Sequence, residues 1–95
     1  MKRIGIAGFG TIGRVVARHI ENSDLPLALA AVSAGDRARA EVAMAQLARP
    51  VPIVDTDELV ALSDVIVDSA PTAAFRDIAE ATLCAGKTLV TVSGA

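Results

Sequence analysis

The chain has 95 residues, of which 53% are hydrophobic, so it is long enough to bury one core and too short for two domains. Its formal net charge of −2 predicts no general attraction to nucleic acid or anionic membranes, and no stretch reaches the roughly 20 apolar residues of a membrane-spanning helix. A single cysteine excludes an internal disulfide and a multi-cysteine metal site, as is typical of a cytoplasmic protein.

The segment from Ile4 to Arg14 contains the strongest pattern in the chain. An apolar run at residues 3–8 predicts a strand, and Gly8, Gly10 and Gly13 then form a G-x-G-x-x-G spacing that continues into a helical pattern. In such a turn the first glycine makes the bend, the second admits a dinucleotide's pyrophosphate, and the third allows close helix packing. The uncapped N–H groups of the helix then face the anion. The alternative is a glycine-rich loop that binds nothing, because this spacing specifies backbone geometry rather than affinity.

A helix from Thr11 to about Asn22 is expected to follow the glycines. The apolar side chains spaced to form one face toward a sheet are Ile12, Val15, Val16 and Ile20. We interpret His19 as structural, because it lies in the last turn, where the helix dipole favours it, without an acidic or cysteine neighbour. Residues 27–34 are almost wholly apolar and predict an interior parallel strand.

An alanine-rich helix is predicted over residues 37–48, with Asp36 as its N-cap. The side chains expected to face inward are Val42, Ala45 and Leu47. Residues 50–54 then predict a short third strand. Pro50 and Pro52 have no N–H to donate, so this strand belongs at an edge of the sheet.

A brief helix is predicted over residues 57–62, capped by Asp55 or Thr56. It leads to a fourth strand at residues 64–68 and, after a further helix, to a fifth strand at residues 88–93. The alternation of strand and helix implies right-handed crossovers and parallel strand pairing.

The last helix is expected to begin with Pro71 in its first turn and to end near Ala85, before Gly86. Its predicted buried side contains Phe75, Ile78, Ala79, Thr82 and Leu83. Cys84 lies roughly opposite Phe75, so we place it near the surface. No neighbour in sequence lowers its pKa, and we do not interpret it as a nucleophile.

The pattern as a whole predicts a single-domain, doubly wound α/β fold of the Rossmann type, with about five parallel strands in the order 3-2-1-4-5. Ligands of such sheets bind at the carboxyl ends of the strands. The candidate positions there are Gly8 to Gly13, Ser33 to Arg37 including Asp36, Ser69, Ala70, Pro71 and Ser93. The plain alternatives are that residues 69–71 form only a loop and a helix start, and that Ser93 is only a strand end.

Four segments, IGIAGFGTIGR, LALAAVSAGDRARA, VIVDSAP and GKTLVTVSGA, resemble the nucleotide-binding half of bacterial L-aspartate dehydrogenases, which are relatives of homoserine dehydrogenase. The resemblance extends over essentially the whole chain. It implies reversible NAD(P)-dependent oxidative deamination of L-aspartate through iminoaspartate to oxaloacetate and ammonia. The positions at which it implies pyrophosphate binding are Gly8, Gly10, Thr11, Ile12 and Gly13. The positions at which it implies other cofactor contacts are Ser69, Ala70, Pro71 and Ser93.

A similar G-F-G-x-I-G-R segment opens glyceraldehyde-3-phosphate dehydrogenase, but the elements that follow here are too closely spaced for that fold. Members of the L-aspartate dehydrogenase family carry a second domain with the substrate-binding residues and a catalytic histidine. The 95 residues do not contain that domain, and His19 does not match its histidine. We therefore expect residues 1–95 to form a dinucleotide-binding domain with no catalytic residue and no metal ligand.

The cofactor preference depends on the residues after the second strand. The family often has an Arg-Asp pair there, whereas this chain has Gly35, Asp36 and Arg37. An acid at this place holds a ribose 2′-hydroxyl and favours NAD, while Ser33 and Arg37 could hold the 2′-phosphate of NADP. We expect NAD or NADP to bind, with NAD slightly favoured.

Two further readings remain open from the sequence. The chain could act as a stand-alone NAD(P)-binding or redox-sensing module, or it could fold and bind nothing. The fifth strand, residues 88–93, contains no proline and no charge that would protect a free edge. We therefore expect this strand to be covered by the missing catalytic domain or by a second copy of the chain.

Overall fold

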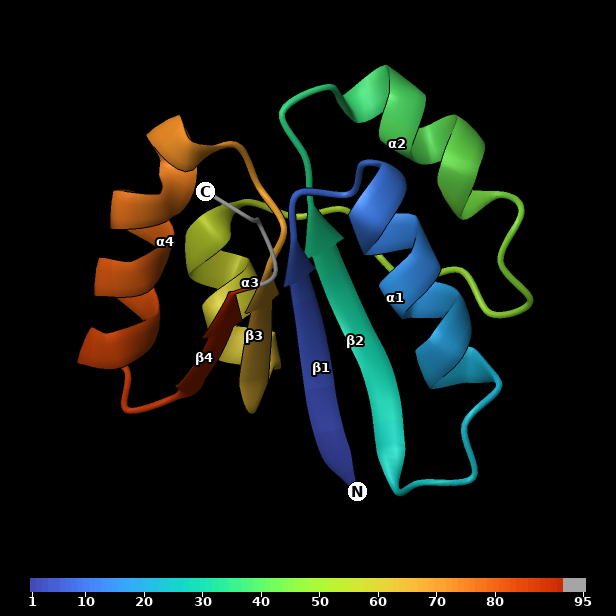
Figure 1. Cartoon of the computed structure of the whole chain (residues 1–95), viewed down its shortest axis with the longest axis horizontal. Helices are drawn as coiled ribbons and strands as arrows, with labels where there is room; N and C mark the ends of the chain where they lie inside the picture. Colours follow the sequence, from blue (N-terminus) through green and yellow to red (C-terminus); the bar gives the residue numbers. More distant parts are fainter. Residues whose placement is uncertain (92–95) are drawn as a thin grey trace.

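The computed structural model describes residues 1–91, and its strands form one parallel sheet (Figure 1). The strands are β1 (Lys2–Ala7), β2 (Leu27–Ser33), β3 (Val65–Asp68) and β4 (Thr88–Thr91), in the order β2-β1-β3-β4. The helices are α1 (Thr11–Glu21), α2 (Arg37–Met44), α3 (Thr56–Leu62) and α4 (Thr72–Cys84). The predicted α/β class with a doubly wound parallel sheet is confirmed, with four strands rather than about five.

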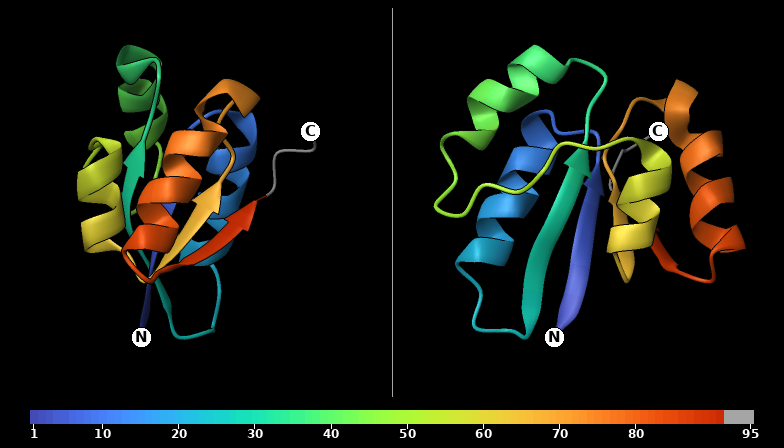
Figure 2. Two further views of the ribbon diagram at one scale, coloured as in Figure 1. Left: turned by 90° about the vertical axis from the view of Figure 1, so that its left-hand side faces the viewer. Right: turned by 180° about the vertical axis from the view of Figure 1, so that it is seen from behind.

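Helices cover both faces of the sheet (Figure 2). Successive strand residues point to opposite faces, so neighbouring side chains of β1 belong to different cores. Ile6 packs with α1 and α2 in one hydrophobic cluster, which also contains Val32 of β2. Ala7 packs in the other cluster with Leu59 of α3 and Ile78 of α4. The sheet is thus packed on both faces. Because β1 pairs with β2 and β3 in parallel, the carboxyl ends of these three strands lie at the same edge.

The predicted third strand at residues 50–54 is wrong as a strand. Val32 and Ile53 form only an isolated parallel bridge, in which the Val32 N–H donates to Pro52 O (3.0 Å) and the Val54 N–H donates to Val32 O (2.8 Å). The prolines at 50 and 52 cannot donate, so the ladder does not extend. The segment still lies beside β2, at the position that the predicted order gives to strand three.

The inward face predicted for α1 is wrong at two positions. Ile12 and Val15 are 48% and 52% exposed, while the buried residues of the helix are Gly13 and Ala17. Because Gly13 and Ala17 are small, α1 can approach the sheet closely. The larger side chains of the helix then lie at the edges of its contact with the sheet. Val16 and Ile20 are half-buried.

Two predictions for the other helices are also wrong in part. The helix expected to reach residue 48 ends at Met44, and Val42 and Ala45 are exposed, while Leu47 is buried from the turn that follows. On α4, Leu83 is 63% exposed, whereas Ile78 and Thr82 are buried as predicted, Ala79 is half-buried and Phe75 is 38% exposed.

The helix starts and the surface residues were predicted more accurately. Asp55 caps α3, accepting from the Glu58 N–H at 2.8 Å, and Pro71 is the N-cap of α4 rather than a residue of its first turn. Cys84 is exposed, as predicted. Among the described residues, no helix is long and apolar enough to cross a membrane. The part of the predicted fifth strand beyond Thr91 lies outside the described residues.

Candidate functional site

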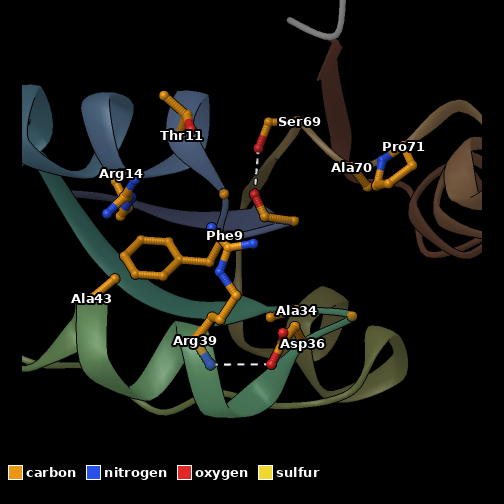
Figure 3. A pocket seen from close by; sticks show the side chains of 13 residues that line it. Phe9, Thr11, Arg14, Ala34, Asp36, Arg39, Ala43, Ser69, Ala70 and Pro71 are labelled. Carbon is orange, nitrogen blue, oxygen red and sulfur yellow. Dashed lines mark hydrogen bonds between the residues drawn. The ribbon is translucent and has the colours of Figure 1, made fainter.

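A cavity of about 490 Å³ opens at the carboxyl ends of β1, β2 and β3 (Figure 3). This volume lies in the range of small-molecule sites, roughly 300–1,000 Å³. Three segments form its wall: the turn and first helical residues after β1, the loop and helix after β2, and the loop after β3. The lining residues are Gly8, Phe9, Gly10, Thr11, Arg14, Ala34, Gly35, Asp36, Arg39, Ala43, Ser69, Ala70 and Pro71.

The three glycines of the turn meet different steric conditions. Gly8 has a φ of +87°, and a Cβ built on it would lie 2.6 Å from Ala70 Cα. A Cβ on Gly13 would lie 2.5 Å from Gly8 O, because α1 packs tightly on the end of β1. A Cβ on Gly10 would meet nothing within 4 Å, since this residue borders the cavity. The first and third glycines are thus needed for the fold, and the second keeps the cavity open.

Three helices begin at this cavity, and two of them, α1 and α4, have no capping side chain and no acid in the first turn. Their N-caps are Gly10 and Pro71. Asp36 caps α2, accepting from the Arg39 N–H at 3.1 Å, and beside the start of α4 the Asp68 carboxylate accepts from the Ala70 N–H at 3.0 Å. An anion in the cavity is therefore best stabilised at the N-terminus of α1.

The free donors of α1 follow from the geometry of its first turn. The first intrahelical bond is made by the Arg14 N–H, which donates to Gly10 O at 3.0 Å. The N–H groups of Thr11, Ile12 and Gly13 precede it and have no carbonyl within the helix to bind. Through these backbone groups, Ile12 and Gly13 can act on an anion although their side-chain positions lie outside the cavity wall.

The ends of β2 and β3 hold the glycine turn from both sides. The Ser33 carbonyl accepts from the Gly8 N–H at 2.9 Å and from the Phe9 N–H at 3.1 Å. The Ser69 N–H donates to Ala7 O at 2.8 Å, and its hydroxyl lies 2.6 Å from Gly8 O. Ser33 thus supports the site through its main chain, and it is not part of the wall.

Two arginines give the cavity its positive charge. Arg14 of α1 and Arg39 of α2 lie on either side of the Phe9 ring (Figure 3). Neither forms an ion pair with an acid of the described residues. Arg37, which the sequence suggested for a 2′-phosphate, is exposed outside the wall, with its Nε 3.4 Å from Glu41 Oε1.

The structure thus brings most of the predicted positions to one cavity. On the wall are Gly8, Phe9, Gly10, Thr11, Ala34, Gly35, Asp36, Ser69, Ala70 and Pro71. Off the wall are Ile12, Gly13, Ser33 and Arg37, and Ser93 lies outside the described residues. The wall residues that sequence reasoning missed are Arg14, Arg39 and Ala43. One feature of the sequence could have indicated Arg39. The residue three positions after an N-cap donates its backbone N–H to the cap side chain, so Arg39 is expected to lie close to Asp36.

The described residues contain no cluster of three or more His, Cys, Asp or Glu side chains that could hold a metal ion. His19 is exposed on α1 and is absent from the cavity wall. What the arrangement offers is an uncapped helix start, a gap in front of Gly10 and two cationic side chains. These features suit the binding of a phosphorylated ligand.

Comparison with known proteins gives concordant matches. The family model for the homoserine dehydrogenase NAD-binding domain matches residues 8–95. L-aspartate dehydrogenase 3 of Bordetella bronchiseptica is 36% identical over 91 residues, covering 95% of this chain and 34% of that protein. L-aspartate dehydrogenase of Methanocella arvoryzae is 36% identical over 93 residues, covering 98% of this chain and 34% of that protein. The chain thus spans about a third of the length of these curated relatives.

A solved structure extends the comparison to a protein with its cofactor in place. Scyllo-inositol dehydrogenase from Lactobacillus casei, with bound NAD(H) and scyllo-inositol, superposes with a TM-score of 0.80 at 26% identity. The match covers 96% of this chain and 27% of that one. The chain therefore has the architecture of about a quarter of that larger dehydrogenase.

Proposed function

Because the chain belongs to the family of homoserine dehydrogenase NAD-binding domains, we propose that its cavity holds the pyrophosphate of NAD or NADP at the N-terminus of α1. The observation that carries this proposal is the combination at Gly10: the cavity opens in front of it, and the helix behind it begins without a capping side chain. The fit is chemical as well as steric, since unbonded N–H groups and a helix dipole favour a dianionic pyrophosphate.

The reaction proposed for the whole enzyme is the reversible oxidative deamination of L-aspartate, through iminoaspartate, to oxaloacetate and ammonia. Similarity to two L-aspartate dehydrogenases at 36% identity supports this substrate. The bound nicotinamide would accept a hydride from the α-carbon of the substrate. The residues of this chain bind and orient the cofactor, and the substrate-binding and acid–base groups belong to a further domain. We place the enzyme in the cytoplasm.

The cavity wall carries charges for both forms of the cofactor. Asp36 presents a carboxylate that can accept from a ribose 2′-hydroxyl, as NAD requires. Arg14 and Arg39 present guanidinium groups that can pair with the 2′-phosphate of NADP. We propose that both cofactors bind and that NAD is slightly preferred, because the Asp36 carboxylate lies on the same wall and repels the 2′-phosphate of NADP.

Gly10→Val tests the site directly. In the unsubstituted chain, calorimetric titration with NAD or NADP should give measurable heat, and saturation should raise the melting temperature by mass action. Gly10→Val should abolish both effects by filling the space in front of the helix. The substitution should leave the melting temperature of the free chain nearly unchanged, since a Cβ there meets nothing and the φ of Gly10 is −98°. Absence of heat at millimolar cofactor with the unsubstituted chain would remove the proposal for these residues.

The proposal that the catalytic groups lie in a further domain has its own test. The purified 95-residue chain should show no L-aspartate-dependent reduction of NAD or NADP, although it binds the cofactor. Turnover by this chain would show that the catalytic groups lie within it. If the natural protein has no substrate domain, binds the cofactor and shows no activity, the result would favour a stand-alone NAD(P)-binding or redox-sensing module.

A further inference from the structure

Ser69 makes the side-chain hydrogen bonds to the glycine turn that are found among the described residues. Its Oγ lies 2.6 Å from Gly8 O and 3.2 Å from Ala7 O, and the side chain is partly buried at the edge of the cavity (Figure 3). Its own N–H donates to Ala7 O at 2.8 Å, so the residue is fixed to the end of β1 at two points.

The backbone that carries Ser69 is itself held by a buried carboxylate. Asp68 is fully buried, and its Oδ1 accepts from the Ala70 N–H at 3.0 Å. Ala70 in turn packs on the turn so closely that a Cβ on Gly8 would lie 2.7 Å from its nitrogen. Asp68, Ser69 and Ala70 therefore form a rigid clamp on the Gly8 peptide.

The chemistry of a hydroxyl limits what Ser69 can do for a bound cofactor. A serine has one proton to donate, and the 2.6 Å contact assigns it to Gly8 O. The oxygen then has only lone pairs left, which repel phosphate oxygens, so the hydroxyl cannot donate to the pyrophosphate. The Gly8 carbonyl is two residues before Gly10, so fixing its direction fixes where the first turn of α1 begins.

From these contacts we infer that Ser69 is a positioning residue: it acts on the pyrophosphate by holding the glycine turn and does not donate a hydrogen bond to the phosphates. The inference rests on the proposed function of the cavity. Without the hydroxyl, the turn spends part of its time in orientations that cannot bind. The apparent affinity then falls by the fraction of molecules that remain competent.

Ser69→Ala and Ser63→Ala form a matched pair for the test. Ser63 is buried, and its Oγ also donates to a backbone carbonyl, Leu59 O at 2.7 Å, but it lies at the opposite end of β3 from the cavity. Each variant loses one hydroxyl-to-carbonyl bond, so each should melt a few degrees lower. Titrations are made with NAD and with ADP, well below both melting temperatures. Ser69→Ala should weaken both ligands equally, by about three- to tenfold, and Ser63→Ala neither.

The choice of ligands separates this inference from a direct contact. ADP keeps the pyrophosphate but lacks the nicotinamide riboside, so a loss seen with NAD alone would show that Ser69 contacts that half of the cofactor and would overturn the inference. Equal affinities in Ser69→Ala and Ser63→Ala would also overturn it. No binding of either ligand by the unsubstituted chain would instead overturn the proposed function, and the inference with it.

A second pair of variants covers the case in which Ser69→Ala does not fold. Threonine and valine have nearly the same shape and differ in the hydroxyl. Ser69→Thr should bind ADP more tightly than Ser69→Val, by the same factor of about three to ten. Equal affinities of the two variants would show that the hydroxyl has no role.

Discussion

Two opposite charges at the start of α2, Asp36 and Arg39, are the side chains that we propose for recognition of the 2′ position of a nucleotide. The Asp36 carboxylate is partly engaged as the cap of the helix, since its Oδ1 accepts from the Arg39 N–H. The Arg39 side chain lies on the same wall and has no acidic partner among the described residues. Arg37 pairs with Glu41 on the outer surface instead. We therefore propose Arg39, which lines the cavity, rather than Arg37 as the cation for a 2′-phosphate.

Arg39→Ala should weaken NADP binding about tenfold and NAD binding much less, because one charge-assisted hydrogen bond is lost. Arg37→Ala is the matched control, since it removes the same side chain two residues away and should change neither affinity. Calorimetric titration of both cofactors against the two variants measures the effect. Equal losses for NAD and NADP in Arg39→Ala would mean that Arg39 contacts a part that the cofactors share.

A second charged pair lies at the other end of the sheet, where it affects stability and not the cavity. The Arg3 side chain and backbone N–H both donate to the Asp64 carboxylate, with Nη2 3.2 Å from Oδ1 and the backbone nitrogen 2.8 Å from Oδ2. These hydrogen bonds lower the pKa of Asp64 from 3.8 to about 2. They join β1 to the start of β3, far from the strand ends that carry the site.

The sign of the pH effect follows from the lowered pKa. A carboxyl whose pKa is lower in the folded state stabilises the fold fully above its unfolded value, and that contribution is lost as the pH falls from about 4 to about 2. Asp64→Asn should therefore be less stable than the unsubstituted chain near neutral pH, and the difference should vanish near pH 2. Urea unfolding across this range tests it. A difference that stays constant with pH would show that the charge of Asp64 is not its cause.

The elements were predictable from the sequence to a greater extent than the directions in which they face. Apolar periodicity and turn residues located every strand and helix of the described residues, and they also predicted a strand at residues 50–54 that the structure does not form. The same periodicity predicted the wrong inward face for α1. It places the larger apolar residues Ile12 and Val15 inside, whereas the small residues Gly13 and Ala17 are the buried ones. Only the close approach of the helix to the sheet makes the small residues the buried ones.

The same limit applies to the candidate site. The glycine turn and residues 69–71 follow strand ends, and the topology alone brings them together at one edge. Arg14 and Arg39 line the cavity because of how α1 and α2 are rotated, and the apolar pattern does not specify that rotation. The sequence could thus specify the backbone part of the site and Asp36, but the two arginines of the wall were not predicted.

Gly8→Ala tests the turn as a structural element. The φ of Gly8 is +87°, and a Cβ added to it would lie 2.6 Å from the Ala70 backbone, so any side chain there is both strained and crowded. We expect a loss of about 2–4 kcal/mol in the free energy of unfolding. Gly10→Ala, two residues on, should cost little, because nothing lies near its Cβ. Chemical denaturation of both variants measures the difference, and equal costs would contradict the distinct roles of the two glycines.

Within the described residues, the two outer strands of the sheet, β2 and β4, have different neighbours. At the β2 end, residues 50–54 run beside the strand and bring two prolines to the edge. At the other end, no strand of the described residues pairs with the outer edge of β4, and Val90 is 43% exposed. An uncharged edge strand rich in β-branched residues promotes pairing with another chain. The relatives are about three times as long, so we propose that the rest of the enzyme, or a second copy, covers this side.

The isolated 95-residue chain should accordingly self-associate through β4 or have poor solubility. Val90→Lys places a charge on the strand and should lower the association measured by sedimentation at rising concentration, because a charged side chain opposes edge-to-edge pairing. Val42→Lys is the matched control, since Val42 is also apolar and is 68% exposed, but lies on α2 at the far side of the sheet. It should leave the association unchanged. If the unsubstituted chain is strictly monomeric at the highest attainable concentration, the edge is protected and β4 is not an interface. Equal effects of the two lysines would point instead to general charge repulsion.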